Sequence, residues 1–171
     1  MSKIRAEIAN VLGSEDATRI PTPEELKKMK YIHQTVDEIL RLYPPVPINI
    51  RFAAEDTTIS SSSSQSKLAV HKGDAIVYST LVLQRRADLH PAPSPEFAPL
   101  DQFSPERWQH WTPKPWTYIP FNGGARICIG QQFALTEIYF TLCRIMQNFD
   151  TLDKVEDPAG AQFIRTEIVG Q

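Results

Sequence analysis

The sequence predicts a mainly α-helical fold that carries small β-sheet elements. Two segments, Ile32 to Tyr43 and Leu135 to Phe149, repeat apolar residues at the three-to-four-residue spacing of an amphipathic helix. Between them lie short apolar or alternating runs, such as residues 46–52 and 75–78, which are typical of brief strands. The length of 171 residues is that of roughly one domain.

The composition excludes several classes of protein. With 42% hydrophobic residues and a formal net charge of −2, the chain is neither disordered by composition nor basic enough to suggest a nucleic-acid partner. Two cysteines are too few for a disulfide-dense scaffold. No apolar run approaches the roughly 18 residues of a membrane span, so we expect no span in this chain.

The first third of the chain predicts three helices. Apolar residues every four positions predict a helix over residues 2–12, which Gly13 ends. Residues 22–25 (Thr-Pro-Glu-Glu) form a capping box that starts a second helix reaching to about Met29. The apolar stripe from Ile32 to Tyr43 predicts a third helix over residues 30–43, and the proline pair that follows ends it.

The middle of the chain predicts strands and loops. The serine run makes residues 60–66 a flexible polar loop. Residues 71–74 (His-Lys-Gly-Asp) separate two apolar runs, at 68–70 and 75–78, and predict that these runs pair around a glycine turn. A further helix is expected over residues 79–90.

The last third begins with a proline-dense segment. Eight of the fourteen prolines fall between residues 91 and 120, among six aromatic residues, which predicts an ordered meander packed on something rather than a linker. A long helix follows over about 129–148. Residues 150–171 are polar and poorly patterned.

Cys128 is the strongest candidate for chemistry. It stands after a glycine-rich turn at the start of the last predicted helix, where free amides, the helix dipole and Arg126 favour a thiolate of low pKa. A thiolate is a nucleophile or a ligand for a soft metal. Gly123, Gly124 and Gly130 would let a flat partner or another backbone approach closely. The residues alone leave open a helix-start cysteine without a role, and a thiol redox protein.

Other reactive side chains give weaker signals. Cys143 lies near the apolar positions of the last helix and is expected to be a small core residue. The four histidines are scattered and form no metal or catalytic motif. Glu38 and Arg41 are neighbours on a helix, opposite its apolar stripe, and by this pattern alone they form a solvated salt pair.

Three sequence motifs follow one another in the order found in one protein family. Glu38-x-x-Arg41 comes first, then Phe103-Ser-Pro-Glu-Arg-Trp108, then Phe121-x-x-Gly124-x-Arg126-x-Cys128-x-Gly130. These motifs and the flanking sequence resemble the C-terminal haem-binding part of cytochrome P-450 enzymes, in particular the fungal microsomal branch that is similar to alkane and fatty-acid hydroxylases. The resemblance implies the corresponding part of that fold: a Glu-x-x-Arg helix, small β segments, a meander, a cysteine loop and a long C-terminal helix. Residues 1–171 would then form a single partial domain.

The resemblance implies a cofactor and its contacts. Cys128 would be the axial thiolate ligand of the iron in haem b (iron protoporphyrin IX). Arg126 would pair with a haem propionate, because a guanidinium suits a carboxylate, and Arg51 would be a second such partner. The full set of implied haem-binding residues is Phe121, Gly124, Arg126, Gly130 and Arg51, beside Cys128.

The resemblance also changes the interpretation of the salt pair. Glu38 and Arg41 would join Arg107 in a buried ion network that locks the meander behind the haem. The extended segment after the Glu-x-x-Arg helix would line the substrate side. Its residues are Val46, Pro47, Ile48, Asn49 and Ile50.

The implied activity is haem-thiolate monooxygenation of a lipophilic substrate, such as an aliphatic chain or a secondary metabolite. Electrons would come from NADPH through a cytochrome P-450 reductase. The full-length family resides in the endoplasmic reticulum membrane, whereas this chain has no anchor, so its expected location is cytoplasmic or unknown. The alternative is a truncated, non-catalytic relic or accessory fragment, because the family's oxygen-activating helix precedes the segments matched here. Residues 166–171 resemble the start of the family's final hairpin.

Overall fold

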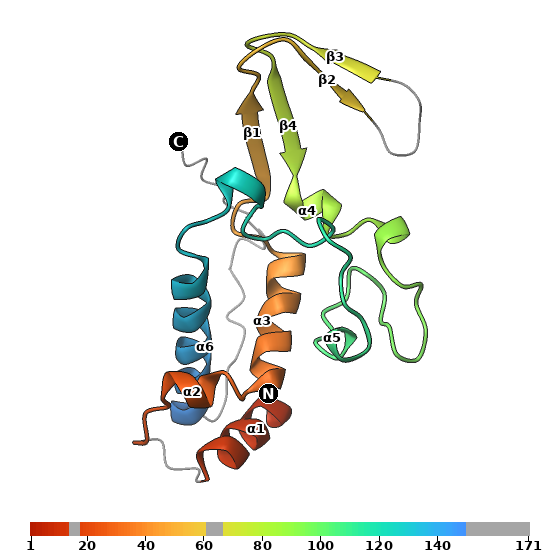
Figure 1. Ribbon diagram of the computed structural model, residues 1–171. Coiled ribbons are helices and arrows are strands. Elements are labelled where there is room, and N and C mark those ends of the chain that lie inside the picture. The colour runs from red at the N-terminus through yellow and green to blue at the C-terminus, as the bar shows by residue number, and fades with distance from the viewer. Residues whose placement is uncertain (14–17, 61–66, 150–171) are drawn as a thin grey trace, which may run out of the picture.

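A computed structural model describes residues 1–13, 18–60 and 67–149 (Figure 1). The serine-rich loop beyond Ser60 and the expected start of a final hairpin at 166–171 lie outside the described residues. The helices are α1 (Ser2–Leu12), α2 (Pro23–Leu26), α3 (Lys30–Leu42), α4 (Thr80–Leu83), α5 (Arg107–His110) and α6 (Gln131–Asn148), with 3₁₀ turns η1 (Ala87–Leu89) and η2 (Gly124–Arg126). The strands are β1 (Ile48–Phe52), β2 (Thr57–Ser60), β3 (Lys67–Val70) and β4 (Ala75–Ser79). The fold is mainly helical with small antiparallel sheets, as predicted.

Helices α3 and α6 lie side by side, with α1 and α2 at one end and the strands extending from the other (Figure 1). The apolar stripe of α1 faces this helical core, and its members Ile4, Ile8 and Leu12 are all buried. They form one cluster with residues from α2, α3 and α6, because burying these side chains together removes their apolar surface from water. The other buried members of the cluster are Leu26, Met29, Ile32, Cys143 and Met146.

The carboxylate of Glu7, on α1, caps the start of α3. Its two oxygens accept hydrogen bonds from the backbone amides of Tyr31 (2.8 Å) and Ile32 (3.0 Å). Amides in the first turn of a helix have no partner within the helix, and the helix dipole favours an anion there. Helix α3 therefore takes its N-terminal cap from another helix, while α2 is capped by Thr22 and Glu25 of its own predicted capping box.

The strands pair differently from the prediction around residues 71–74. Strand β4 pairs with β1, and β3 pairs with β2, so the two runs beside the glycine turn do not pair with each other. The turn instead extends the β1–β4 ladder, since Ala53 N–H donates to the Asp74 carbonyl and Gly73 N–H donates to the Ala53 carbonyl. The four strands thus form two separate two-stranded sheets.

Two helix boundaries also differ from the prediction. Residues 79–90 hold only α4 and η1, because the backbone becomes extended at Arg86 (φ −70°, ψ 123°) and Pro91 lies just beyond. Helix α6 begins at Gln131, so Cys128 precedes its first turn. The prediction of an ordered meander is confirmed, because its aromatic rings pack together: Trp108 lies 5.4 Å from Trp111 and 4.8 Å from Tyr118 between ring centroids. Among the described residues, no helix combines the length and the apolar character needed to cross a membrane.

Candidate functional site

Residues 119–130, here called the cysteine loop, fold back on themselves through backbone hydrogen bonds. Asn122 N–H donates to the Ile119 carbonyl (3.0 Å), and Ile127 N–H donates to that of Gly124 (3.2 Å). Cys128 N–H then donates to the Phe121 carbonyl at 2.9 Å, which closes the loop at its two ends. The loop therefore holds Cys128 at a defined place just before α6.

The loop needs residues that accept a left-handed backbone. Asn122 has φ 62° and Gly124 has φ 67°, values that asparagine and glycine tolerate far better than other residues. Gly123 lies against an aromatic side chain. A β-carbon added there would stand 2.5 Å from the indole ring of Trp116, so this ring, which is 64% exposed, would have to move to make room. The glycine-rich turn is visible in the sequence, whereas the contact of Gly123 with Trp116 is not.

The face of the loop that carries Cys128 is open and apolar in the described residues. Cys128 is exposed, Ile129 is fully exposed, and Phe133 on α6 has 74% of its surface exposed. At Gly130, an added β-carbon would meet no atom within 4 Å. An exposed thiol with a fully exposed apolar neighbour and open space at Gly130 is what a surface covered by a partner or ligand would show.

The donor set around Cys128 fits haem rather than a metal held by protein ligands alone. Among residues 1–13, 18–60 and 67–149, no group of three or more His, Cys, Asp or Glu side chains gathers to hold a metal ion. A single thiol suits an iron whose other ligands come from a macrocycle. The open space at Gly130 and the exposed Ile129 leave room for such a flat group beside Cys128.

The two arginines expected near haem propionates come from different elements. Arg126 is exposed and ends η2 inside the cysteine loop. Arg51 is half-buried on β1, where its Nη1 donates to the Ile50 carbonyl (2.8 Å) and its guanidinium lies 5.8 Å from the Tyr78 ring centroid. The structure places both on segments that meet where the β1–β4 ribbon joins the cysteine loop (Figure 1).

Glu38, Arg41 and Arg107 form an ion network whose side chains are all 0% exposed. Arg41 binds Glu38 through two atoms, with Nε–Oε2 at 2.8 Å and Nη2–Oε1 at 2.9 Å. Arg107 Nε lies 3.4 Å from Glu38 Oε1. The solvated-pair interpretation drawn from the helix pattern alone is wrong, because α5 and the meander cover this side of α3.

Further donors complete the environment of Glu38. The Ser104 amide donates to Oε1 (3.1 Å) and the Trp108 indole donates to Oε2 (3.0 Å), both from the meander. Burial raises the pKa of Glu38, but the hydrogen bonds and charge of Arg41, the Ser104 amide and the charge of Arg107 outweigh it and hold the pKa below its usual value. The lowered pKa keeps Glu38 an anion at neutral pH, and this anion joins α3 to the meander.

Gln84 is a connecting residue that sequence reasoning missed. Its side chain is 0% exposed, and Nε2 donates to the carbonyls of Leu40 (3.0 Å) and Arg41 (3.3 Å) at the end of α3. Its Oε1 accepts from the Ile119 amide (3.1 Å) at the start of the cysteine loop. A glutamine followed by two arginines is typical of a solvent-exposed segment. Nothing in the local pattern therefore indicated that Gln84 is buried.

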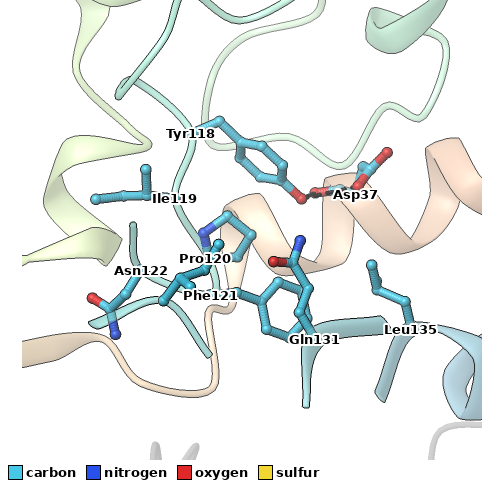
Figure 2. A pocket seen from close by; sticks show the side chains of 9 residues that line it. Asp37, Tyr118, Ile119, Pro120, Phe121, Asn122, Gln131 and Leu135 are labelled. Atoms are coloured by element: carbon cyan, nitrogen blue, oxygen red, sulfur yellow. Dashed lines mark hydrogen bonds between the residues drawn. The ribbon is translucent and has the colours of Figure 1, made fainter. Parts of the chain in front are cut away.

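A cavity of about 180 Å³ lies between α3, the cysteine loop and the start of α6 (Figure 2). On one side, the Tyr118 hydroxyl donates to Asp37 Oδ1 (3.0 Å), while Phe121 and Gln131 lie opposite. Burial raises the pKa of Asp37, and burial together with the Asp37 charge raises that of Tyr118. This hydrogen bond attaches the segment leading into the loop to α3.

The residues expected on the substrate side divide between two faces. Ile48 and Ile50 are exposed by 53% and 40%, whereas Asn49 between them is half-buried and bonded to the cysteine loop. Val46 is 40% exposed and Pro47 is buried, and their carbonyls accept hydrogen bonds from Thr80 and Ser79. The apolar side chains of Val46, Ile48 and Ile50 are thus exposed, whereas the side chain of Asn49 is half-buried against the cysteine loop.

Comparison with known proteins agrees with the fold and the cysteine loop. The family model for cytochrome P450 matches residues 1–164, nearly the whole chain. The chain belongs to the cytochrome P450 family, whose members carry haem, and the resemblance seen in its motifs is confirmed.

The relatives include several fungal proteins. The chain is 46% identical over 153 residues to cytochrome P450 monooxygenase pvhE of Talaromyces variabilis, covering 88% of the chain and 28% of that protein. It is 41% identical over 157 residues to cytochrome P450 52A10 of Candida maltosa, covering 89% and 30%. It is 38% identical over 161 residues to cytochrome P450 52A13 of Debaryomyces hansenii, covering 91% and 30%. The chain therefore spans less than a third of the length of these relatives.

Proposed function

We propose that this chain supplies the thiolate side of the haem site in a monooxygenase. The observation that carries the proposal is one exposed thiol, Cys128, at the end of an internally bonded loop and beside an open apolar face. A thiolate ligand donates electron density to haem iron and favours cleavage of the O–O bond, which is the chemistry that the bound haem supplies. Family membership supports haem as the cofactor.

The residues of the cysteine loop would bind and orient the haem. Cys128 would ligate the iron, and the loop closure through Phe121 would fix the position of its sulfur. Gly124 and Gly130 would leave room for the flat ring. Arg126 and Arg51 would pair with the propionates, since a guanidinium binds a carboxylate through two parallel hydrogen bonds.

The ion network would act on this site indirectly. Glu38, Arg41 and Arg107 join α3 to the meander, and the meander leads into the cysteine loop. A network with no exposed side chain resists rearrangement, because moving one member would leave a buried charge unpaired. We assign these three residues a structural role behind the haem.

The substrate proposed is lipophilic, either an aliphatic chain or a secondary metabolite. Its support is the exposed apolar group at Val46, Ile48 and Ile50, together with the monooxygenase names of fungal relatives such as pvhE. Electrons would come from NADPH through a cytochrome P-450 reductase, and the full-length enzyme would act at the endoplasmic reticulum membrane. The substrate, the electron donor and the location are proposed from relatives of which this chain spans less than a third.

The second candidate is an accessory protein that binds haem without oxidising a substrate. It is favoured by the openness of the described face, where Ile129 is fully exposed and Phe133 is 74% exposed. Oxygen chemistry requires that water be kept from the reacting centre.

Haem reconstitution tests the proposal. The chain is mixed with haemin, reduced and exposed to carbon monoxide, and a strongly red-shifted Soret band of the thiolate type is expected. Cys128→Ser should abolish that band, because a hydroxyl is a poor ligand for haem iron. Cys143→Ala is the matched control, since Cys143 is buried in the helical core and should leave the band intact.

Haem uptake and substrate turnover together separate the two candidates. Failure of the unchanged chain to take up haem overturns both candidates. Haem uptake with a thiolate band supports both, and oxidation of a long-chain fatty acid in the presence of NADPH and reductase then favours the monooxygenase. Uptake without turnover favours the accessory role.

A further inference from the structure

Three polar side chains connect the cysteine loop to the β1–β4 ribbon. The Tyr78 hydroxyl donates to Asn122 Oδ1 at 2.9 Å, and Asn122 Nδ2 donates to Asn49 Oδ1 at 3.2 Å. Asn49 and Tyr78 stand directly opposite each other in the antiparallel register of β1 and β4. One side chain of the loop therefore holds both strands of the ribbon at a single level.

Asn122 is placed where it controls how the loop closes. Its own amide donates to the Ile119 carbonyl, and its left-handed backbone (φ 62°) makes the turn. The carbonyl that accepts from Cys128 N–H belongs to Phe121, which immediately precedes Asn122. Fixing the Asn122 side chain therefore fixes the peptide that receives the Cys128 amide.

Asn49 is unusual for its position in a strand. Asparagine is depleted in strands, and here it stands between Ile48 and Ile50, whose side chains are exposed. Its Oδ1 accepts from Asn122, whereas its Nδ2 is buried and has no hydrogen-bond partner, so both N–H donors of that nitrogen are unused. A half-satisfied polar residue inside a strand costs stability, which indicates a requirement other than strand formation.

We propose that Asn122, held by Tyr78 and Asn49, is a positioning residue that attaches the cysteine loop to the β1–β4 ribbon and thereby sets the place of Cys128. The functional meaning of this inference rests on the proposed role of Cys128 as a haem ligand. The hydrogen-bonded link itself is a property of the chain without haem. The two can therefore be tested separately.

The first test measures hydrogen exchange at the Cys128 amide in the haem-free chain. Tyr78→Phe removes the hydroxyl and keeps the ring, and Asn122→Gly removes the side chain and keeps a residue suited to φ 62°. Each variant should speed exchange at Cys128 by roughly tenfold, the effect of losing one part-buried hydrogen bond. Exchange in the middle of α3 should stay unchanged.

Tyr43→Phe is the matched control. Tyr43 is 63% exposed, and an arginine guanidinium lies 5.8 Å from its ring centroid, the same distance as at Tyr78. It has no place in the link, so exchange at Cys128 should match that of the unchanged chain. Equal acceleration in Tyr43→Phe and Tyr78→Phe would contradict the proposal, as would an Asn122→Gly variant within twofold of the unchanged chain.

Asn122→Asp tests the geometry of the link. A carboxylate still accepts from the Tyr78 hydroxyl, but its second oxygen takes the place of the Nδ2 that faces Asn49 Oδ1. Turning over the Asn49 amide replaces that Oδ1 with the unpaired Nδ2, which can then donate to the carboxylate. Exchange at Cys128 should therefore stay near that of the unchanged chain. Behaviour like that of Asn122→Gly would overturn the assignment of the three partners.

A spectroscopic reading in the haem-loaded chain completes the test. At fixed pH, Tyr78→Phe and Asn122→Gly should lower the ratio of thiolate-type to neutral-thiol-type Soret band after reduction with carbon monoxide, while Tyr43→Phe should not. An unchanged ratio in both variants, with haem bound through thiolate in the parent, would show that the link does not position Cys128. Absence of a thiolate band in the parent would overturn the proposed function, and the exchange data would still decide the link.

Discussion

The ion network contains residues of two family motifs and the cysteine loop carries the third, and the two sites have opposite surroundings. Glu38, Arg41 and Arg107 are 0% exposed, and both oxygens of Glu38 are hydrogen-bonded. Cys128 is exposed, and Gly130 faces open space. The first site is enclosed by described residues, which pair every charged group although Arg107 Nη1 has no hydrogen-bond partner. The second site is left open by the part of the chain that the structure describes. Changes in the first should appear in folding stability, and changes in the second should appear in binding.

The largest expected effect is at the closed site. Glu38→Gln leaves two buried guanidinium groups without their anion, which should lower the free energy of unfolding by about 3–5 kcal/mol. Urea denaturation measures this loss. Glu96→Gln, at an exposed residue of the meander, is the matched control and should change it by under about 0.5 kcal/mol. A loss below about 1 kcal/mol for Glu38→Gln would show that the network is not sealed from water.

An intermediate effect is expected from two glycines of the same loop. Gly123→Ala brings a β-carbon to 2.5 Å from the Trp116 ring, which must move. Because that residue is 64% exposed, the displacement should cost only about 1 kcal/mol of unfolding free energy. Gly130→Ala meets no atom of the chain, so stability should change little while haem uptake weakens. Urea denaturation and haem titration of both variants measure the contrast. Equal haem affinity in Gly130→Ala and the parent would mean that this space is not used by haem.

A smaller effect is expected at a carboxylate of the exposed surface. Lys3, at 2.5 Å, and the Tyr31 hydroxyl, at 2.8 Å, bond Glu106, and the bond to Lys3 is the main cause that lowers its pKa to about 2. A lowered pKa stabilises the fold above the ordinary carboxyl value of 4.5 and loses that contribution as pH falls toward about 2. Glu106→Gln should remove this acid dependence, at a cost below about 1 kcal/mol near neutral pH because Lys3 is solvated. Thermal unfolding between neutral pH and about pH 2.5 checks it, and an unchanged slope would assign the dependence to other carboxylates.

The smallest effect on stability is expected at Cys128 itself. Cys128→Ser alters one exposed atom, so the free energy of unfolding should change by under about 0.5 kcal/mol. The same substitution should abolish the thiolate Soret band. Urea denaturation and haem titration should be run on this variant and on Glu38→Gln. Cys128→Ser should lose the thiolate band and keep its stability, whereas Glu38→Gln should lose stability. A large loss of stability in Cys128→Ser would mean that the thiol also packs in the fold.

The sequence predicted best those elements that local periodicity defines. The stripe of Ile4, Ile8 and Leu12 and the capping box at Thr22 both have the structure expected of them. The ordered meander was predicted from its aromatic residues, whose rings do pack together. The resemblance of the motifs to a family, and not the helix pattern, predicted that Glu38 and Arg41 contact Arg107. The helix pattern could not predict this contact, because the segment that buries this face of α3 lies 66 to 69 residues away.

Features that depend on distant partners could not be predicted. Strand β4 pairs with β1, more than 20 residues earlier in the chain, and backbone hydrogen bonds between residues 53 and 73–74 extend that ladder, whereas the glycine turn alone resembled a simple hairpin. Gln84 and Asn49 look like surface residues in their local sequence, yet each bonds to the cysteine loop from far along the chain. Local pattern records which residues prefer to be buried, and it does not record which distant backbone groups need a partner.

The cap that Glu7 places on α3 bears on recombination between members of this family. Because the carboxylate on α1 satisfies amides 24 and 25 residues further on, a chimera joined between α1 and α3 would take the helix from one parent and its cap from the other. Such a junction preserves all three family motifs and can still loosen the helix that carries the first of them. A junction before Ser2, or one within the turn after α3, keeps donor and acceptor from the same parent.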